Sequence, residues 1–288
     1  MKRPFRDGKI HPPFFIVLFL LVSCGLFMGL KIHIDHIPRK SIPGASVIFI
    51  PSGKYLKYAT FGYSSLAADL IYLWAIQYYS DYSITERYLY LDHIFSIINE
   101  LDPRYLDPYE VGAQIAAFEA GDVNLALKIL DRGMEKNPDE WIFPFEAGHY
   151  ARNVKKDFNL ARNYFYKASQ IKGSPPLMRR LYASAALGAE DYQTAWNTWL
   201  EIYQTTRDEK IKKLASNHLY QVKSAKDITL LQEAIEAYKK RYGHHPSDLE
   251  QLVKTGLIRA VPRDLDDENY IYDPETGNVE SVKIWWKR

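Results

Sequence analysis

A short pattern recurs three times in the middle of this 288-residue chain, and its spacing constrains the fold more than any other feature. The segments 121–126, 156–161 and 190–195 lie 35 and 34 residues apart, and each has an aspartate second and an alanine sixth. A large apolar residue follows four positions after each alanine. A period of about 20 to 50 residues indicates stacked units, none of which can bury its apolar face alone. The repeated residues are Asp122, Asp157, Asp191, Ala126, Ala161, Ala195, Leu130, Phe165 and Trp199.

Each unit is expected to be two helices joined by a short turn. The aspartate suits the N-cap of the second helix, because its carboxylate can accept a hydrogen bond from the backbone N–H groups of the first turn. The alanine suits a close crossing of two helices, and the large residue fills the space one turn later. Pro103, Pro138 and Pro175 stop one helix and can start the next. An ordinary helical domain without repeats is the alternative.

The pattern resembles the tetratricopeptide repeat (TPR), a helix–turn–helix unit of about 34 residues. The resemblance covers three units over 104–206 and a degenerate unit over 64–103. The tryptophan and glycine that are usual in the first helix are not in place, so a different helical-hairpin array stays open. The resemblance implies a mainly α solenoid whose first helices line a groove for a partner protein or peptide. The groove positions in this chain are Val111, Ile115, Phe118, Phe143, Glu146, Tyr150, Asn153, Arg180 and Ser184.

The segments 61–79 and 87–105 resemble a family of TPR proteins of the bacterial envelope. Within the first of them, Ser64 and Ser65 can cap a helix that is apolar almost all round. We expect this helix to be deeply buried or to face a partner.

An uncharged stretch of seventeen residues, 14–30, predicts one membrane-spanning helix. At about 1.5 Å per residue it is roughly 25 Å long, at the short end of what crosses a bilayer. Basic residues precede it, which favours an uncleaved signal-anchor with its tail in the cytoplasm and residues 31–288 outside. In one alternative, Leu21-Val22-Ser23-Cys24 resembles a bacterial lipoprotein signal and Cys24 is lipidated. In the other, the segment is an ordinary cleaved signal.

The rest of the chain is electrically almost neutral. Residues 1–30 hold four bases and one acid, and removing them from the totals of 37 and 35 leaves 33 basic and 34 acidic residues. Without a basic field we expect no nucleic-acid partner. The single cysteine excludes a disulfide within the chain, and no nucleophile-elbow, phosphate-loop, dinucleotide or metalloprotease motif occurs. The sequence therefore predicts a protein that is not an enzyme.

The repeat signal fades after residue 207. Helical spacing predicts two helices, over 208–222 and 227–241, and the turn residues 273–277 predict a hairpin of two strands. Residues 228–282 resemble the carboxyl-terminal part of type II secretion pseudopilins, on Tyr242-Gly243, Pro246, Leu249 and Leu252. No cofactor is expected, although that resemblance makes the acidic run Asp264, Asp266, Asp267 and Glu268 a candidate calcium loop.

These predictions divide the chain into a cytoplasmic tail (1–13), a membrane anchor (14–32), an extended non-helical linker with a strand at 46–51 (33–63), TPR-like repeats (64–223) and a pseudopilin-like α+β module (224–288). We expect a periplasmic scaffold or adaptor, anchored in the bacterial inner membrane, that serves assembly of an envelope complex, pilus or secretion system. One alternative is a structural subunit of a membrane complex, with helix 66–78 as its interface. Another is an envelope enzyme acting on glycan or peptide, with the acidic run and His244 in one pocket.

Overall fold

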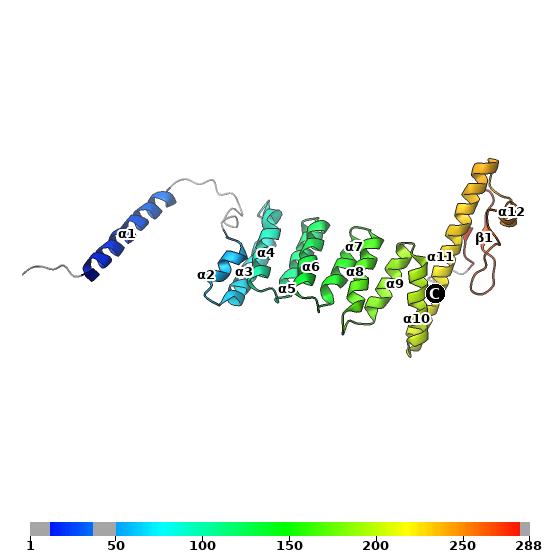
Figure 1. The fold of residues 1–288 in the computed structure, drawn as a ribbon. Coiled ribbons are helices and arrows are strands. Elements are labelled where there is room, and N and C mark those ends of the chain that lie inside the picture. The colour runs from blue at the N-terminus through cyan, green and yellow to red at the C-terminus, as the bar shows by residue number, and fades with distance from the viewer. Residues whose placement is uncertain (1–11, 37–49, 283–288) are drawn as a thin grey trace, which may run out of the picture. The chain divides into compact units, whose positions relative to one another are not determined.

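The computed structural model describes residues 12–36 and 50–282 of a mainly helical chain (Figure 1). Backbone contacts divide the chain into two compact units, Met1–Phe49 and Ile50–Arg288. The strand predicted over 46–51 falls mostly outside the described residues.

The first unit contains helix α1, Pro12–Asp35. Its 24 residues span about 36 Å, and the part Ile16–Asp35 has a mean hydropathy of 2.1. From Ile16 onward its large apolar side chains are exposed, and Cys24 is exposed among them. This helix is long and apolar enough to cross a membrane, and it contains the predicted span.

The second unit is a series of helices followed by a small strand pair. It begins with α2 (Gly53–Ala59), α3 (Ser64–Ser80), the 3-10 turn η2 (Arg87–Tyr90) and α4 (Leu91–Leu101). Then come α5 (Asp107–Gln114) with the π-helical turn η3 (Ile115–Glu119), α6 (Val123–Lys136), α7 (Ile142–Asn153), α8 (Phe158–Gln170), α9 (Leu177–Gly188) and α10 (Tyr192–Thr205). The unit ends with α11 (Glu209–Tyr242), α12 (Glu250–Lys254), β1 (Ile271–Tyr272) and β2 (Val279–Glu280).

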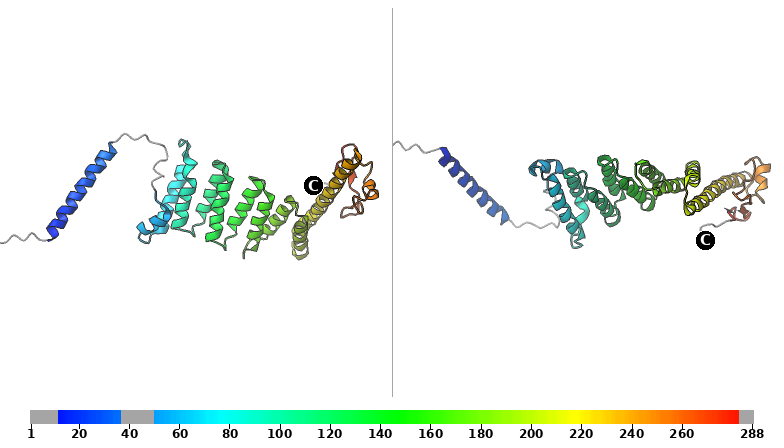
Figure 2. Two further views of the ribbon diagram at one scale, coloured as in Figure 1. Left: turned by 45° about the horizontal axis from the view of Figure 1, so that its top comes forward. Right: turned by 90° about the horizontal axis from the view of Figure 1, so that it is seen from below.

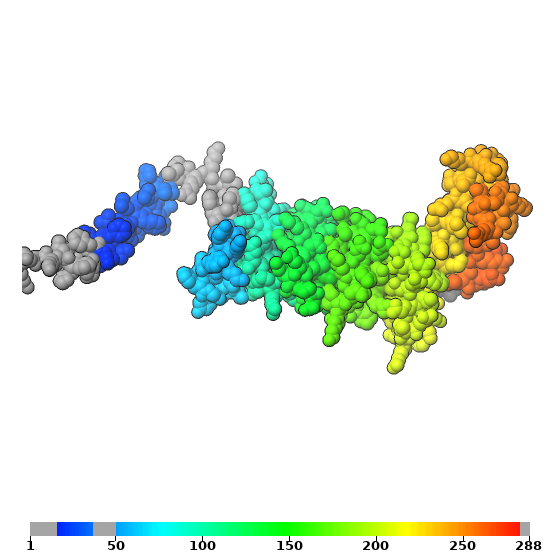
Figure 3. Space-filling model, in the orientation of Figure 1, coloured from blue at the N-terminus to red at the C-terminus, as the bar shows by residue number. Residues whose placement is uncertain are grey.

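From α4 to α11, each helix packs against the next one in the chain. Figures 1 and 2 show these helices side by side in a row, in the order of the sequence. The side chains fill the spaces between neighbouring ribbons on the face drawn in Figure 3. Neighbours in sequence are therefore neighbours in space over α4–α11.

The turns before α6, α8 and α10 have the same construction. The residue before each repeated aspartate is in the left-handed region, with φ of 71° at Gly121 and 59° at both Lys156 and Glu190. The aspartate then accepts a backbone N–H three residues later. This confirms the three predicted N-caps, which are Asp122–Leu125 (2.9 Å), Asp157–Leu160 (2.9 Å) and Asp191–Thr194 (3.1 Å).

The repeated apolar residues lie in the core between the helices. All six are at most 1% exposed: Ala126, Ala161, Ala195, Leu130, Phe165 and Trp199. The helices approach so closely that a Cβ added to Gly148 on α7 would lie 2.6 Å from the Phe165 ring on α8. Small residues at these crossings let the large ones fill the spaces beside them.

The carboxyl-terminal part has its own core, in which β1, β2 and α12 pack on the last turns of α11. The predicted hairpin is confirmed, since Ile271 pairs with Glu280 in antiparallel register. Buried Asp227 accepts a hydrogen bond from the Tyr270 hydroxyl at 2.7 Å and forms an ion pair with Lys223. These bonds fix the hairpin to α11.

Three predictions about helix boundaries are wrong. One helix, α11, replaces the two predicted over 208–222 and 227–241. It continues through the predicted break because the segment 209–242 has neither glycine nor proline and because Asp227 is satisfied where it lies. Helix α3 begins at Ser64, so the two serines do not cap it, and no side chain bonds its first turn.

The third error is α2, which forms in the linker predicted to be non-helical. Its formation depends on tertiary packing. Gly53 lies against α4 so tightly that a Cβ would be 2.6 Å from the carbonyl oxygen of Ile97. The carboxylate of Glu100 on α4 accepts the backbone N–H of Lys54 at 2.8 Å, so another helix supplies the cap.

Replacing Asp157 with alanine should lower the free energy of unfolding by about 1 kcal/mol, because the N–H of Leu160 loses its acceptor. Asp157→Asn keeps an acceptor oxygen and should lose clearly less. Urea denaturation of the full-length chain in detergent, followed by circular dichroism, measures both. Equal losses in the two variants would contradict the capping role.

Candidate protein-binding site

The nine predicted groove residues lie on α5, η3, α7 and α9, the first helices of the three hairpins. Their exposure differs widely. Phe143 has no exposed surface and Ile115 has 6%, so both lie in the packing between helices. Phe118 and Asn153 are exposed, and Val111, Glu146, Arg180 and Ser184 are half-buried. Tyr150 is 6% exposed.

Three of the nine meet in one recess of about 340 Å³ between α5–η3 and α7. Phe118 comes from η3, and Glu146 and Tyr150 come from α7. The Phe118 and Tyr150 rings meet edge to face with centroids 5.5 Å apart, which makes one wall of the recess. The structure does not bring the other six predicted residues into this recess.

Four residues of the recess were missed by sequence reasoning: Glu110, Gln114, Phe145 and His149. On α5 and η3 the predicted positions were Val111 and Ile115, each one residue later than Glu110 and Gln114. The π-helical turn is wider than an α-turn, so Phe118 shares a face with 110 and 114. The sequence signal for this face was the four-residue spacing of positions 110, 114 and 118. It is easy to overlook because two of these residues are polar and one is aromatic, so they form no apolar stripe.

The recess is acidic, and its acids are partly removed from water. Burial raises the pKa of Glu110, and the nearby charges of Glu146, Asp107 and Glu140 raise it further. Burial likewise raises the pKa of Glu146, against the opposing effects of His149 and of the Tyr150 hydroxyl, which donates to it. Burial and these carboxylates raise the pKa of Tyr150. Partly buried carboxylates that repel each other beside aromatic rings have the chemistry to attract a cation.

The acidic run near the C-terminus is organised by hydrogen bonds. Asp264 is buried, and its Oδ1 accepts the backbone N–H groups of Asp266 and Glu268 at 2.9 Å each. Its other oxygen accepts the Tyr220 hydroxyl, while Asp267 pairs with a neighbouring arginine. Across residues 12–36 and 50–282, no group of three or more His, Cys, Asp or Glu side chains is placed to hold a metal ion. The carboxylate of Asp264 is therefore occupied by hydrogen bonds that hold its own loop together.

No protein-family model matches this chain, and no curated protein matches it in sequence.

Replacing Glu146 with glutamine should stabilise the protein at neutral pH. Because the pKa of Glu146 is higher in the folded than in the unfolded protein, protonation of this carboxyl stabilises the fold. This contribution to the free energy of unfolding is present below about pH 4.5 and is lost as the pH rises through the raised pKa. Glu146→Gln removes that loss. Its melting temperature should exceed the wild-type value near pH 7, and the difference should shrink toward about pH 4.

Thermal unfolding of the full-length chain at several pH values measures this difference. Glu236→Gln, an exposed change on α11, is the matched control and should show none. A gain that does not depend on pH would contradict the electrostatic explanation.

Proposed function

We propose that this protein is a scaffold or adaptor held in a bacterial inner membrane by α1, with the second unit in the periplasm. The apolar length of α1 supports an anchor, and the basic residues before it support that orientation. Exposed apolar side chains continue past Cys24 through Phe27 and Met28, which supports an uncleaved anchor over a lipidated terminus. The expected setting is assembly of an envelope complex, a pilus or a secretion system.

The second unit is proposed to be a TPR-like solenoid. Three turns of the same construction, three buried alanines at repeat spacing and the packing of each helix on its successor support this assignment. In such an array a partner segment lies along the first helices, which here are α5, α7 and α9.

The acidic aromatic recess carries the functional proposal. Glu110 and Glu146 lose part of their hydration in the folded chain, and neither forms an ion pair among the described residues. His149 in the same recess offsets only part of the effect of burial on Glu146. A lysine or arginine side chain of a partner would neutralise them and pack on Phe118 and Tyr150. The partner is therefore expected to be a protein segment that carries a basic residue beside apolar ones.

A photo-crosslinking residue at position 118 of the full-length chain should capture the partner in intact cells. Mass spectrometry of the adduct should locate a lysine or arginine near the crosslinked position. The double change Glu110→Gln and Glu146→Gln should reduce the adduct about tenfold, since two charge-assisted contacts are lost.

The matched controls are a crosslinker at Tyr166, an exposed tyrosine on α8, and the Glu236→Gln variant. An adduct of equal yield from position 166, or one that survives the double change undiminished, would overturn the proposed groove.

A second candidate function, a structural subunit of a membrane complex, is favoured by the surface of α3. Leu66, Leu70 and Leu73 lie at helical spacing and are 55–60% exposed, while the other side of α3 packs on α4. Three exposed leucines on one stripe are typical of a surface that a partner covers.

If α3 is an obligate interface, changing these three leucines to serine should shift the protein from a large complex to a smaller species on native gels of solubilised membranes. Serine at Leu230 and Leu265, two exposed leucines outside α3, should leave the complex intact. Unchanged migration of the α3 variant would contradict the role of a structural subunit that depends on α3.

A further inference from the structure

A polar ladder joins the second helices α4 and α6. Asp92 on α4 forms ion pairs with Lys128 at 2.6 Å and with Arg132 at 2.7 Å, both on α6. One turn further along, Arg132 Nη1 donates to the Ser96 hydroxyl at 2.7 Å. Asp92 and Ser96 of α4 are thus both bonded to side chains of α6.

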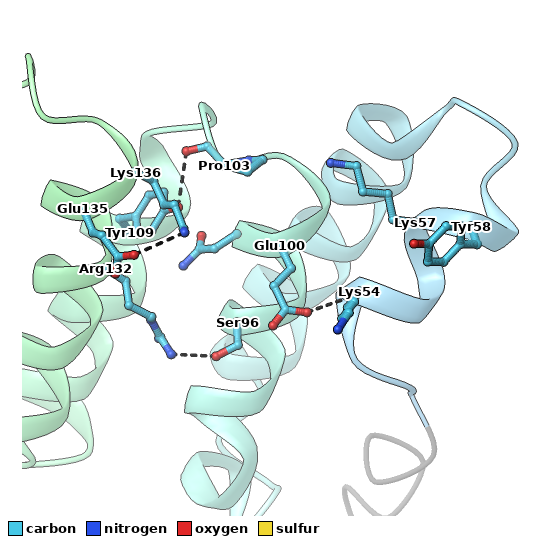
Figure 4. A pocket seen from close by; sticks show the side chains of 11 residues that line it. Lys54, Lys57, Tyr58, Ser96, Glu100, Pro103, Tyr109, Arg132, Glu135 and Lys136 are labelled. Atoms are coloured by element: carbon cyan, nitrogen blue, oxygen red, sulfur yellow. Dashed lines mark hydrogen bonds and ion pairs between the residues drawn. The ribbon is translucent and has the colours of Figure 1, made fainter.

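The ladder stops at the next turn of α4, where a pocket of about 750 Å³ opens. Figure 4 shows Arg132, Glu135 and Lys136 of α6 on one side, Lys54, Lys57 and Tyr58 of α2 on the other, and Ser96 and Glu100 of α4 between them. Asn99 of α4 also lines this pocket.

Asn99 is only 6% exposed, and among the described residues neither its Oδ1 nor its Nδ2 has a hydrogen-bond partner. Two nitrogens of Arg132, Nε and Nη2, are also buried and unpartnered there. A buried polar group without a partner costs about 1 to 3 kcal/mol, and native proteins rarely keep several together. Two such side chains in the lining of one pocket indicate a ligand that completes their hydrogen bonds.

We propose that this pocket binds an acidic peptide. The side-chain amide of Asn99 offers one donor and one acceptor side by side, and a peptide group of a ligand matches both. The unpaired nitrogens of Arg132 and the ammonium of Lys136 take a carboxylate close to that peptide group. The carboxylate can be an acidic side chain or the end of the chain.

The charge of the lining selects the same ligand. Lys54, Lys57, Arg132 and Lys136 line the pocket together with the carboxylates of Glu100 and Glu135. Glu100 accepts the backbone N–H of Lys54 through Oε2, and Glu135 forms an ion pair with Lys136 at 3.4 Å, so each acid of the lining already has a partner in the chain. Two carboxylates oppose a multiply charged phosphate but tolerate a single carboxylate paired with Arg132.

This site goes beyond the proposed function and does not rest on it. It is built by α2, α4 and α6 and is basic, whereas the recess of the first helices is acidic. Loss of binding at one site is therefore separable from loss at the other.

Fluorescence anisotropy of the full-length chain in detergent tests the proposal with three tetramethylrhodamine-labelled peptides. The first is Gly-Ala-Leu-Glu-Leu-Gly with an amidated end. The second has glutamine in place of the glutamate and a free carboxyl end, and the third has glutamine and an amidated end. We expect the first, the second or both to bind with Kd below about 100 µM, and the neutral third at least tenfold more weakly. The pattern identifies which carboxylate the pocket takes.

Asn99→Leu should weaken binding of the acidic probe about tenfold while raising the melting temperature, because it removes a buried unpaired amide of similar size. Lys136→Gln at the exposed rim should weaken binding without unfolding the protein. The matched controls Asn163→Leu on α8 and Lys239→Gln on α11 change exposed residues and should bind like the wild type.

Three results would each overturn the proposal. One is the absence of binding by either acidic probe at about 1 mM. Another is equal binding of the neutral probe. The last is binding to Asn99→Leu as tight as to the wild type. The double variant Glu110→Gln/Glu146→Gln should bind the acidic probe like the wild type, which would show that the acidic recess plays no part in this binding.

Discussion

The way each hairpin turns between its two helices determines how closely the helices of the second unit can pack. At each turn a residue in the left-handed region is followed by an aspartate, whose backbone N–H bonds the preceding helix while its side chain caps the next. For Asp157 the two contacts are to the Ala151 carbonyl and the Leu160 N–H, both at 2.9 Å. Lys156 and Glu190 hold this conformation although each carries a side chain, which costs of order 1 kcal/mol.

Tertiary packing offsets the free-energy cost of this strained backbone. The fixed turn brings the second helix back against the first at a crossing where the side chain is alanine. The space beside the alanine is filled by Leu130, Phe165 or Trp199. If the turn opened, these large side chains would lose their contacts, and the packing of each hairpin on the next would weaken with them. The repeat is therefore one device in which turn, cap and crossing depend on each other.

Local chemistry explains which parts of the fold could be predicted from the sequence. The caps, the apolar anchor helix and the C-terminal hairpin follow from residues close together in the chain. Helix α2 could not be predicted, because its cap is Glu100, 46 residues away. The continuity of α11 depends on Asp227, which satisfies its carboxylate on Tyr270 of the hairpin. In both cases the deciding contact comes from elsewhere in the fold.

The candidate site was predicted only in part for a related reason. Assigning the groove by repeat register treats α5 as a regular helix, and the π turn at Ile115–Glu119 changes which side chains share its open face. The basic pocket gave no sequence signal at all. Its lining comes mainly from three helices, which are far apart in the sequence. Asn99 follows the apolar residues Ile97 and Ile98, and an asparagine in a helix is ordinarily expected to face water, so its burial could not be foreseen.

Helix α5 lies between the two candidate sites and contributes to both. Tyr109 lines the basic pocket, and the next residue, Glu110, lines the acidic recess. Consecutive helical residues point about 100° apart, so one helix can serve two surfaces without a break.

In each site the folded chain retains polar groups that it does not satisfy by itself: carboxylates that repel each other in the recess, and amide and guanidinium groups without partners in the pocket. The caps and the ladder at Asp92 satisfy their carboxylates within the chain, while a few other buried atoms, such as Trp199 Nε1 and the Tyr79 hydroxyl, also lack a partner among the described residues. At the two sites, apolar or neutral residues of the same size should give a more stable fold, so stability alone does not explain the polar residues there. The proposed recognition of other chains would explain why such groups are kept, because a partner would supply the missing charges and hydrogen bonds only when it is bound.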